Sequence, residues 1–351
     1  MRFLIIIGIL FCSVSASSQT LKRQKNITRM GIPYGNYSGI VHIKGNQYAV
    51  VSDKDNADGF HFFDIDINTK KGKIKSVRRY EPEKSKENEE RAKLLQLKQR
   101  DIEGICYRAS SNTLYISGEA DQQILEYSFD GIPTGKCLNI PDIFSRANIT
   151  TNRGFESLSY NGTTKTFWTT TENVLPADEK TNPYTIRLQS FDDNLQPLHQ
   201  YAYRMDNPLN NKKSRRFVHG VPDILALDDG SLIIMEREVH VTPKYLGSYC
   251  IIKLYLIHPS EEYAIDGNDI SRTKVLKKTM LTMFETTLKI GKMNFANYEG
   301  MCIGPKLDDG RQTILLINDS QNGEGNKLYR AKDYVKLIIF DQYFPPAHNI
   351  K

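Results

Sequence analysis

One short pattern recurs along most of the chain and limits the folds that are open to it. An acid, a small residue and an apolar run follow one another, starting at Glu103, Glu156 and Glu299. A weaker copy surrounds Asp223, and a fifth copy has Ser38 in place of the acid. Because a chain with internal repeats folds as copies of one structural unit, the fold has to accommodate five such units.

A second strand-like run follows each copy of the pattern. The turns between the two runs are rich in Gly, Asn, Asp and Ser, and the runs themselves are rich in β-branched and aromatic residues. Both features are typical of antiparallel hairpins. Every second run ends in an acid, and these acids are Asp53, Glu119, Glu172, Glu236 and Asp319.

A third run in every unit and a fourth in most of them predict an all-β fold, a β-propeller of five four-stranded blades. A two-sheet sandwich would not repeat the pattern. Six blades, one of them degenerate, is the alternative count, because about 66 residues per unit exceeds the usual repeat of roughly 40–50. The last unit has no clear fourth strand, and we expect the N-terminal segment 26–30 to supply it and close the ring.

The N-terminal segment 1–18 differs from the rest of the chain. A positive start at Arg2 is followed by an apolar run over 3–11 and then by small residues. This pattern predicts a signal peptide over 1–18 and leaves 19–351 as a single domain. The apolar run is too short to span a bilayer, and no other apolar segment is long enough to do so. We therefore expect an exported protein, periplasmic or secreted, without stable membrane insertion.

Charge and cysteine spacing indicate which kinds of binding partner and metal site are not expected. The net charge of +6 is spread thinly and no nucleic-acid module is recognisable, so we expect no nucleic acid partner. No Cys-x-x-Cys pair occurs, which argues against a zinc ribbon. We expect Cys106 and Cys302 to be inert thiols packed between blades, and the protein to be a monomer.

The repeated acids should meet at one end of the propeller. A hairpin brings the start of its first strand beside the end of its second, and the first strands line the central channel. Both sets of acids should therefore gather at the channel mouth, where they are candidate metal ligands. The nine acids are Asp53, Glu103, Glu119, Glu156, Glu172, Asp223, Glu236, Glu299 and Asp319.

So many carboxylates in a small volume need compensation, because like charges raise each other's pKa. A divalent metal, calcium first among them, accepts 6–8 such oxygens and is the predicted cofactor. Arg153, Arg237 and His219 lie close to the acids in sequence and are candidates for binding an anionic substrate. The structural alternative for any single acid is capping of backbone N–H groups or ion pairing between blades.

Several motifs together resemble the family known for the esterase-like activity of phytase. They are Asn-Ile-Pro-Asp-Ile-Phe at 139–144, Arg-Gly-Phe-Glu at 153–156, Leu-Asp-Asp-Gly-Ser-Leu-Ile-Ile-Met-Glu-Arg at 227–237, and Asn-Tyr-Glu-Gly-Met-Cys-Ile-Gly-Pro at 297–305 with Asp-Gly-Arg at 309–311. The resemblance covers about residues 35–341. It implies a secreted or periplasmic phytase-like β-propeller whose repeated Glu and Asp residues carry phosphatase or esterase activity. By motif it extends to Glu103, Glu156, Glu236, Arg237 and Glu299, whereas Ser38 departs from the pattern.

These observations lead to an expected function. We expect a metal-assisted hydrolase of phosphate or carboxylate esters that acts on a small anionic or ester substrate. The candidate catalytic residues are Glu103, Glu156, Glu236 and Glu299. One alternative is a propeller that binds a ligand or a protein on its loop-rich face without catalysis, and another is a lactonase-like hydrolase. Turnover distinguishes an enzyme from a binding module.

Overall fold

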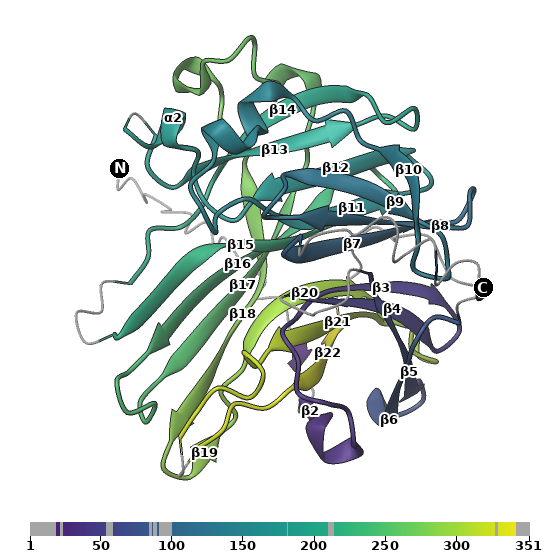
Figure 1. The fold of residues 1–351 in the computed structure, drawn as a ribbon. Helices are drawn as coiled ribbons and strands as arrows, with labels where there is room; N and C mark the ends of the chain where they lie inside the picture. Colours follow the sequence, from purple (N-terminus) through teal and green to yellow (C-terminus); the bar gives the residue numbers. More distant parts are fainter. Residues whose placement is uncertain are drawn as a thin grey trace, which may run out of the picture.

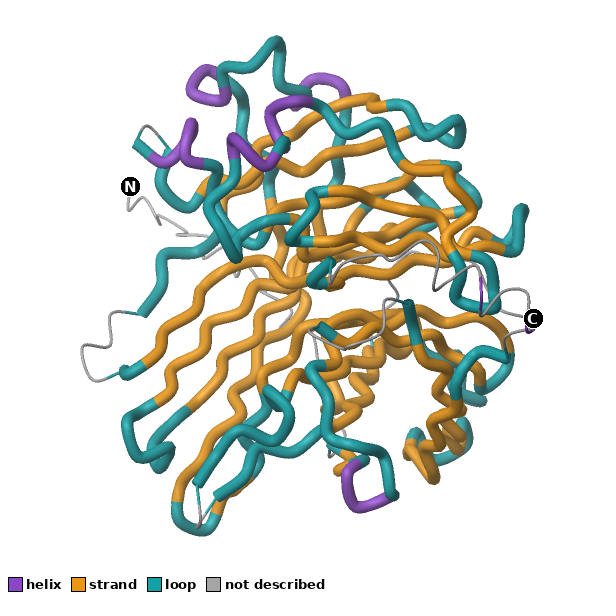
Figure 2. The backbone as a smooth tube through the Cα atoms, viewed as in Figure 1, coloured by secondary structure: helices purple, strands orange, loops and turns teal. Residues whose placement is uncertain are grey.

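Five antiparallel sheets stand around a central channel in the computed structural model (Figures 1 and 2). The structure describes residues 19–21, 24–53, 59–83, 86, 90, 100–180, 182–209, 214–326 and 329–341, so the predicted signal peptide lies outside the described part. The predicted five-bladed β-propeller is confirmed, and the alternative of six blades is wrong.

The blades follow one another along the chain, and the first strand of each blade is the innermost. Blade 1 consists of β3 (Tyr37–Lys44), β4 (Gln47–Ser52), β5 (His61–Asn68) and β6 (Lys73–Tyr80). Blade 2 consists of β7 (Ile102–Arg108), β8 (Thr113–Gly118), β9 (Gln123–Tyr127) and β10 (Pro133–Cys137). Blade 3 consists of β11 (Phe155–Asn161), β12 (Thr166–Thr171), β13 (Thr185–Phe191) and β14 (Pro197–Arg204).

Blade 4 has the longest strands and projects beyond its neighbours (Figure 1). Its strands are β15 (Arg216–Ala226), β16 (Leu232–Val241), β17 (Tyr249–Ile257), β18 (Lys278–Lys289) and the short β19 (Lys292–Met293). Blade 5 follows with β20 (Asn297–Ile303), β21 (Gln312–Asp319) and β22 (Tyr334–Phe340).

The N-terminal segment closes the ring as predicted, but of the predicted residues 26–30 only Asn26 belongs to the closing strands. Two short strands, β1 (Gln19–Leu21) and β2 (Lys25–Asn26), pair antiparallel with β22 and complete blade 5. The predicted bounds were wrong beyond Asn26, because Thr28–Met30 forms a 3-10 helix that ends at Gly31 with a φ of 85°. Closure joins the two ends of the described chain within one sheet.

Helices are short in the described part of the chain. Those with defined bounds are η1 (Thr28–Met30), η2 (Asp142–Phe144), η3 (Arg146–Asn148), α2 (Pro176–Glu179), η4 (Glu261–Tyr263) and η5 (Ile270–Arg272). None of the helices among the described residues has the length and hydropathy that a bilayer crossing needs.

The hydrophobic core consists of five layers, one between each pair of neighbouring blades. Alternating side chains of each strand pack against the blade before and the blade after, because successive side chains of a strand point to opposite faces. Cys106 lies in the layer between blades 2 and 3, and Cys302 in the layer between blades 5 and 1. Burial raises the pKa of both thiols well above its usual value. The prediction that both cysteines pack between blades is confirmed.

Each inner strand carries a β-bulge at the same point, where the pairing with the second strand shifts register. The residues within the bulges are Ser38, Glu103 with Gly104, Glu156, Val221 with Pro222, and Glu299. A bulge gives one strand an extra residue and re-aims its side chain. The bulge is the structural basis of the sequence repeat.

The repeat requires a small residue at or directly after the bulge because the backbones of neighbouring inner strands approach each other closely. A Cβ at Gly39 would lie 2.5 Å from the carbonyl oxygen of Glu103 in the next blade. A Cβ at Gly104 would lie 2.6 Å from the backbone nitrogen of Leu158, and one at Gly300 would lie 2.7 Å from the carbonyl oxygen of Ser38. Glycine within a strand is typical of such close backbone approach.

We expect Gly104→Ala to lower the free energy of unfolding by about 1–3 kcal/mol, the usual cost of overpacking, because the new methyl group would press on the backbone of blade 3. The matched control is Gly162→Ala, where the nearest atom to a new Cβ lies 4.0 Å away. Urea unfolding of the two variants and the native protein measures the difference. Equal destabilisation by both substitutions would contradict the packing explanation.

Candidate functional site

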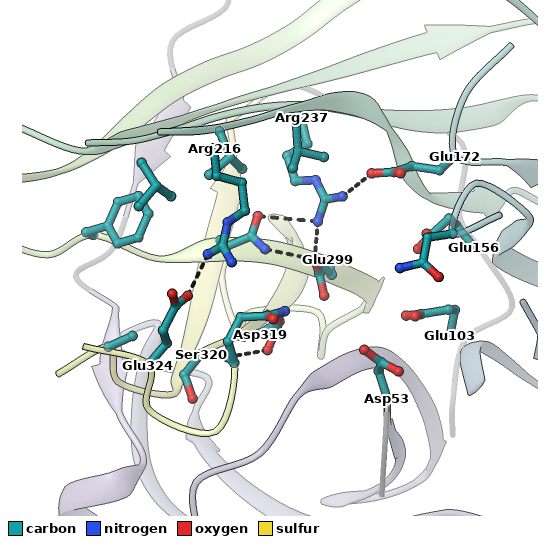
Figure 3. Close-up of a pocket in the computed structure, with 18 of the residues that line it drawn as sticks. Asp53, Glu103, Glu156, Glu172, Arg216, Arg237, Glu299, Asp319, Ser320 and Glu324 are labelled. Atoms are coloured by element: carbon teal, nitrogen blue, oxygen red, sulfur yellow. Dashed lines mark hydrogen bonds and ion pairs between the residues drawn. The ribbon is translucent and has the colours of Figure 1, made fainter. Parts of the chain in front are cut away.

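A cavity of about 300 Å³ opens at one end of the channel, and we call it the acidic mouth. Seven of the nine predicted acids line it together with one predicted basic residue, Arg237 (Figure 3). The seven acids are Asp53, Glu103, Glu119, Glu156, Glu172, Glu299 and Asp319. The structure therefore brings most of the predicted carboxylates together.

These acids occupy two equivalent positions of the hairpins in blades 1, 2, 3 and 5. Glu103, Glu156 and Glu299 lie in the bulges of their inner strands. The other four lie at the end of the second strand or directly after it, so the hairpin places them beside the bulge. Glu119, for example, accepts a hydrogen bond from the backbone N–H of Gly154 in the next blade at 2.9 Å. The geometry of the hairpins therefore holds the carboxylates close together, although like charges repel one another.

Blade 4 departs from this arrangement, and Asp223 does not line the mouth as predicted. The bulge of β15 contains Val221 and Pro222, and Asp223 follows it, paired with Met235. The buried carboxylate of Asp223 accepts hydrogen bonds from the backbone N–H groups of Met301 at 2.6 Å and of Ile224 at 2.9 Å. Burial raises the pKa of Asp223, and these backbone hydrogen bonds oppose the shift. Asp223 therefore links β15 to β20 inside the ring.

Glu236 does not join the other acids either, contrary to the predicted position. Glu236 and Arg237 are neighbours on β16 and point to opposite faces of the sheet, and Arg237 faces the mouth. Glu236 accepts hydrogen bonds from the hydroxyl of Tyr203 at 2.6 Å and from the backbone N–H of Asp206 at 3.0 Å. It also pairs with Lys278, which makes it part of the contact between blades 3 and 4.

The two other predicted substrate-binding residues lie outside the acidic mouth. Arg153 is exposed on the surface, and its neighbour Asn152 lines the cavity instead. His219 is buried, with its ring 5.8 Å from that of Tyr184 in an edge-on contact. Burial lowers the pKa of His219, so the ring is neutral at neutral pH. Neither residue is part of the cavity wall.

Arg237 is the basic centre of the acidic mouth. Its guanidinium donates to Glu172 on one side and to Glu299 on the other, and to the side-chain oxygen of Asn297 at 3.3 Å (Figure 3). Burial alone would lower the pKa of Arg237, but the carboxylates of Glu299 and Glu172 outweigh it and raise that pKa. Arg237 is therefore permanently charged and joins blade 4 to blades 3 and 5.

Glu103 and Glu156 are in a different situation, because no described residue donates a hydrogen bond to either carboxylate (Figure 3). Both side chains are buried. Burial, and then Glu156 and Asp53, raises the pKa of Glu103 well above its usual value. Burial, and then Glu172 and Glu119, does the same for Glu156, although Arg237 opposes it. Within the described structure, these two carboxylates lack the donors that Glu172 and Glu299 have.

The same part of the mouth fits a hard cation. Carboxylate oxygens of Glu103, Glu119 and Glu156 lie within 4.8 Å of one another, and so do those of Asp53, Asp101 and Glu103. Calcium and magnesium prefer oxygen ligands of this type. Buried carboxylates without donors are the groups that a bound cation would compensate.

Sequence reasoning missed several residues in or beside the cavity. Asp101 precedes a repeated acid by two positions, and Glu324 lies on a loop without any repeat. Arg216 pairs with Glu324 at 2.7 Å on the rim of the mouth, opposite Asp53 (Figure 3). Position within the repeat could have indicated Asp101, whereas the loop residues carry no signal that a sequence pattern reveals.

Without added metal, we expect the protein to lose stability as the pH rises from 5 to 7.5. Burial raises the pKa of Glu299 to about 7, against the effect of Arg237, and that of Asp319 to about 6, against hydrogen bonds from Gln321. An acid whose pKa is higher in the folded state than in the unfolded state contributes its full stabilisation at pH values below its unfolded pKa, which is near 4. This contribution to the free energy of unfolding disappears as the pH rises through the folded pKa. For Glu299 it is on the order of 3 kcal/mol.

Thermal unfolding in EDTA at constant ionic strength measures this effect. The midpoint should fall by several degrees between pH 5 and 7.5, and Glu299→Gln should flatten the curve. Acids whose folded pKa is lowered, such as Glu126, change protonation below this window. His42 and His219, whose folded pKa is lowered by burial, oppose the trend up to their unfolded pKa near 6.5. A midpoint that is level or rises with pH would contradict the expectation.

Comparison with known proteins gives one family. The model of the phytase-like family, described as esterase-like activity of phytase, matches residues 32–321. The match includes all seven acids of the mouth and Arg237. No curated protein matches the chain in sequence.

Solved structures resemble the chain only distantly. A streptogramin B lyase is 12% identical with a TM-score of 0.38, covering 92% of this chain and 98% of that one. The PQQ-bound aldose sugar dehydrogenase from Streptomyces coelicolor is 10% identical with a TM-score of 0.41, covering 92% and 99%. The Dos1 propeller is 8% identical with a TM-score of 0.31, covering 90% and 71%.

Proposed function

This chain belongs to the phytase-like family, described by the esterase-like activity of phytase, and from that premise we propose that the acidic mouth hydrolyses phosphate or carboxylate esters with the help of a divalent cation. The observation that carries the proposal is the pair of buried carboxylates, Glu103 and Glu156, to which no described residue donates a hydrogen bond. We also propose that calcium is the cation and, from the signal-peptide pattern of the N-terminal segment, that the protein is exported.

Glu103, Glu119 and Glu156 would hold the cation, with Asp53 and Asp101 beside them. When bound, a divalent cation polarises the ester oxygen and lowers the pKa of water. The chain's own contribution is a compact set of oxygen ligands held by three blades. Because the bulges fix the backbone beneath them, these ligands keep their separation when the site is filled.

Glu103 and Glu156 are also the groups that can move a proton. Burial and neighbouring carboxylates raise the pKa of both, so each takes up a proton more readily than an ordinary carboxylate does. Because a cation held by both would keep both ionised, one of them would accept a proton from the attacking water and then pass it to the leaving alcohol. Glu172 and Glu299 are less suited to this role because both are bound to Arg237.

Arg237 and Arg216 would attract an anionic substrate. Arg237 lies in the cavity wall, and Arg216 is on the rim, where its pair with the half-buried Glu324 leaves its guanidinium partly exposed. An arriving phosphate would compete with Glu299 and Glu172 for Arg237. A neutral carboxylate ester lacks this attraction, so the geometry favours phosphate esters of the two classes.

We expect calcium to raise the unfolding midpoint of the EDTA-treated protein, because a ligand that binds only the folded state stabilises it by RT ln(1 + [L]/Kd). The measurement compares calcium, magnesium and manganese at pH 7.5. Glu103→Gln should remove most of the rise. Glu261→Gln, at an acid of η4 outside the cavity wall, serves as the matched control and should leave it unchanged. Equal midpoints with and without every ion would mean that no metal binds.

We expect Glu156→Gln to lower kcat by about 10²-fold or more, since proton transfer by a placed carboxyl contributes 10²–10⁴. Suitable substrates are phytate, p-nitrophenyl phosphate, p-nitrophenyl acetate and a simple lactone. Opening of the lactone alone would favour the lactonase-like alternative. Saturable binding without product would favour a non-catalytic binding propeller, and hydrolysis unaffected by Glu156→Gln and by EDTA would rule out the proposed site.

A further inference from the structure

A second cavity, of about 800 Å³, lies where the outer strands of blades 4 and 5 meet. We call this cavity the basic rim pocket. The basic residues that line it are Lys25, Arg29, Lys292, Lys332 and Lys336. The other described residues of its wall are Gln24, Asn26, Met30, Gly291, Met293, Asn294 and Tyr334. No acid is among them, so the cavity is positive throughout its described wall.

Lys336 is the unusual member of this group. It lies in the middle of β22 and is only 7% exposed. Its ammonium group lies 4.7 Å from the ring centre of Phe284 and 5.9 Å from that of Tyr298, and it makes no hydrogen bond or ion pair with a described residue. Aromatic faces compensate a buried cation only in part. Burial, and then Lys292, lowers the pKa of Lys336 to about 8.

The four other cations also lack ion-pair partners among the described residues. Elsewhere on the protein basic side chains find acids readily, as Arg311 does with Asp309 at 2.7 Å. The acid closest in sequence is Asp333, next to Lys332, but its carboxylate accepts a hydrogen bond from the hydroxyl of Thr28 and does not line the pocket. Five cations without acidic partners among the described residues repel one another, and an anion that binds between them offsets this repulsion.

Hydrogen bonds hold the wall of the pocket in place. The side-chain amide of Gln24 donates to the carbonyl oxygen of Asn294 at 2.8 Å, and the hydroxyl of Tyr298 donates to the side-chain oxygen of Gln24 at 2.8 Å. The N-terminal segment that closes the ring is thereby attached to both blades. The cations are therefore presented by three joined segments rather than by one flexible loop.

We propose that the basic rim pocket binds a multiply charged phosphate anion, either free in solution or as the headgroup of a lipid. The lipid source has one feature in its favour: the β18–β19 hairpin exposes Ile290 at 91% and Met293 at 58% beside the pocket. Apolar side chains at the edge of a basic surface are typical of membrane-surface binding. This site is separate from the acidic mouth and does not depend on the function proposed for it.

The test measures binding of tripolyphosphate by calorimetry, and binding of vesicles by sedimentation, both at physiological ionic strength. The vesicles consist of phosphatidylcholine and phosphatidylglycerol in equal parts, with pure phosphatidylcholine as the uncharged comparison. Lys336→Met keeps the packing on Phe284 and Tyr298 but removes the charge. Lys292→Met removes an exposed cation, so it probes the pocket even if the first variant fails to fold. Lys44→Met, at an exposed lysine that ends β3 outside the pocket, is the matched control.

We expect tripolyphosphate to bind saturably, with an affinity at least tenfold weaker in Lys336→Met and weakened in Lys292→Met, and unchanged in Lys44→Met. If tripolyphosphate binds in this way and the vesicles do not, the free anion is the source. Binding of anionic vesicles but not of tripolyphosphate, with the same dependence on the variants, would support the proposal and identify the lipid source. Binding of neither probe, or equal binding by all four proteins, would overturn it.

Discussion

The close approach of the five inner strands is the constraint on which the rest of the structure depends. Around the channel, backbone lies against backbone, so that glycine is required where β3, β7 and β20 meet the next blade. The same crowding coincides with a bulge in every inner strand. The bulges that accompany this close packing orient the side chains they contain toward one end of the channel, and in three blades those side chains are carboxylates.

Electrostatics then separates the carboxylates into two groups. Glu172 and Glu299 are compensated by Arg237, which also joins three blades. Glu103 and Glu156 have burial and mutual repulsion without a described donor. Such an arrangement costs stability in the absence of a ligand, and it is typical of sites that are built for one, since stability and function often compete at the same residues. The basic rim pocket is a similar arrangement of opposite charge, because its cations lie close together without acidic partners among the described residues.

The sequence predicted the blades, their number and most of the mouth, because hairpins repeat locally and their turn residues are visible. It failed where position depends on pairing. Glu236 and Glu238 are both acids near the end of β16, and only the register, in which Gly220 pairs with Arg237, shows that Glu238 corresponds to Glu119. Glu238 in turn contacts His240 at 2.6 Å and does not line the cavity. Closure by the N-terminal segment was predicted, but the bounds of its strands were not, because two short segments at one end of the described chain pair with β22 at the other.

Blade 4 makes the distribution of charge around the acidic mouth asymmetric. If all five blades carried an acid in the bulge, a bound molecule would meet an almost fivefold-symmetric ring and could adopt several equivalent orientations. Ser38 in blade 1 and Val221 in blade 4 interrupt that symmetry, and Arg237 places a positive charge beside blade 4. The cavity therefore has a positive pole at blade 4 and a negative pole at blades 1 to 3. A ligand with a charged end and a reactive end has only one way to align with this dipole, so the departure of the fourth repeat from the pattern helps to select the orientation.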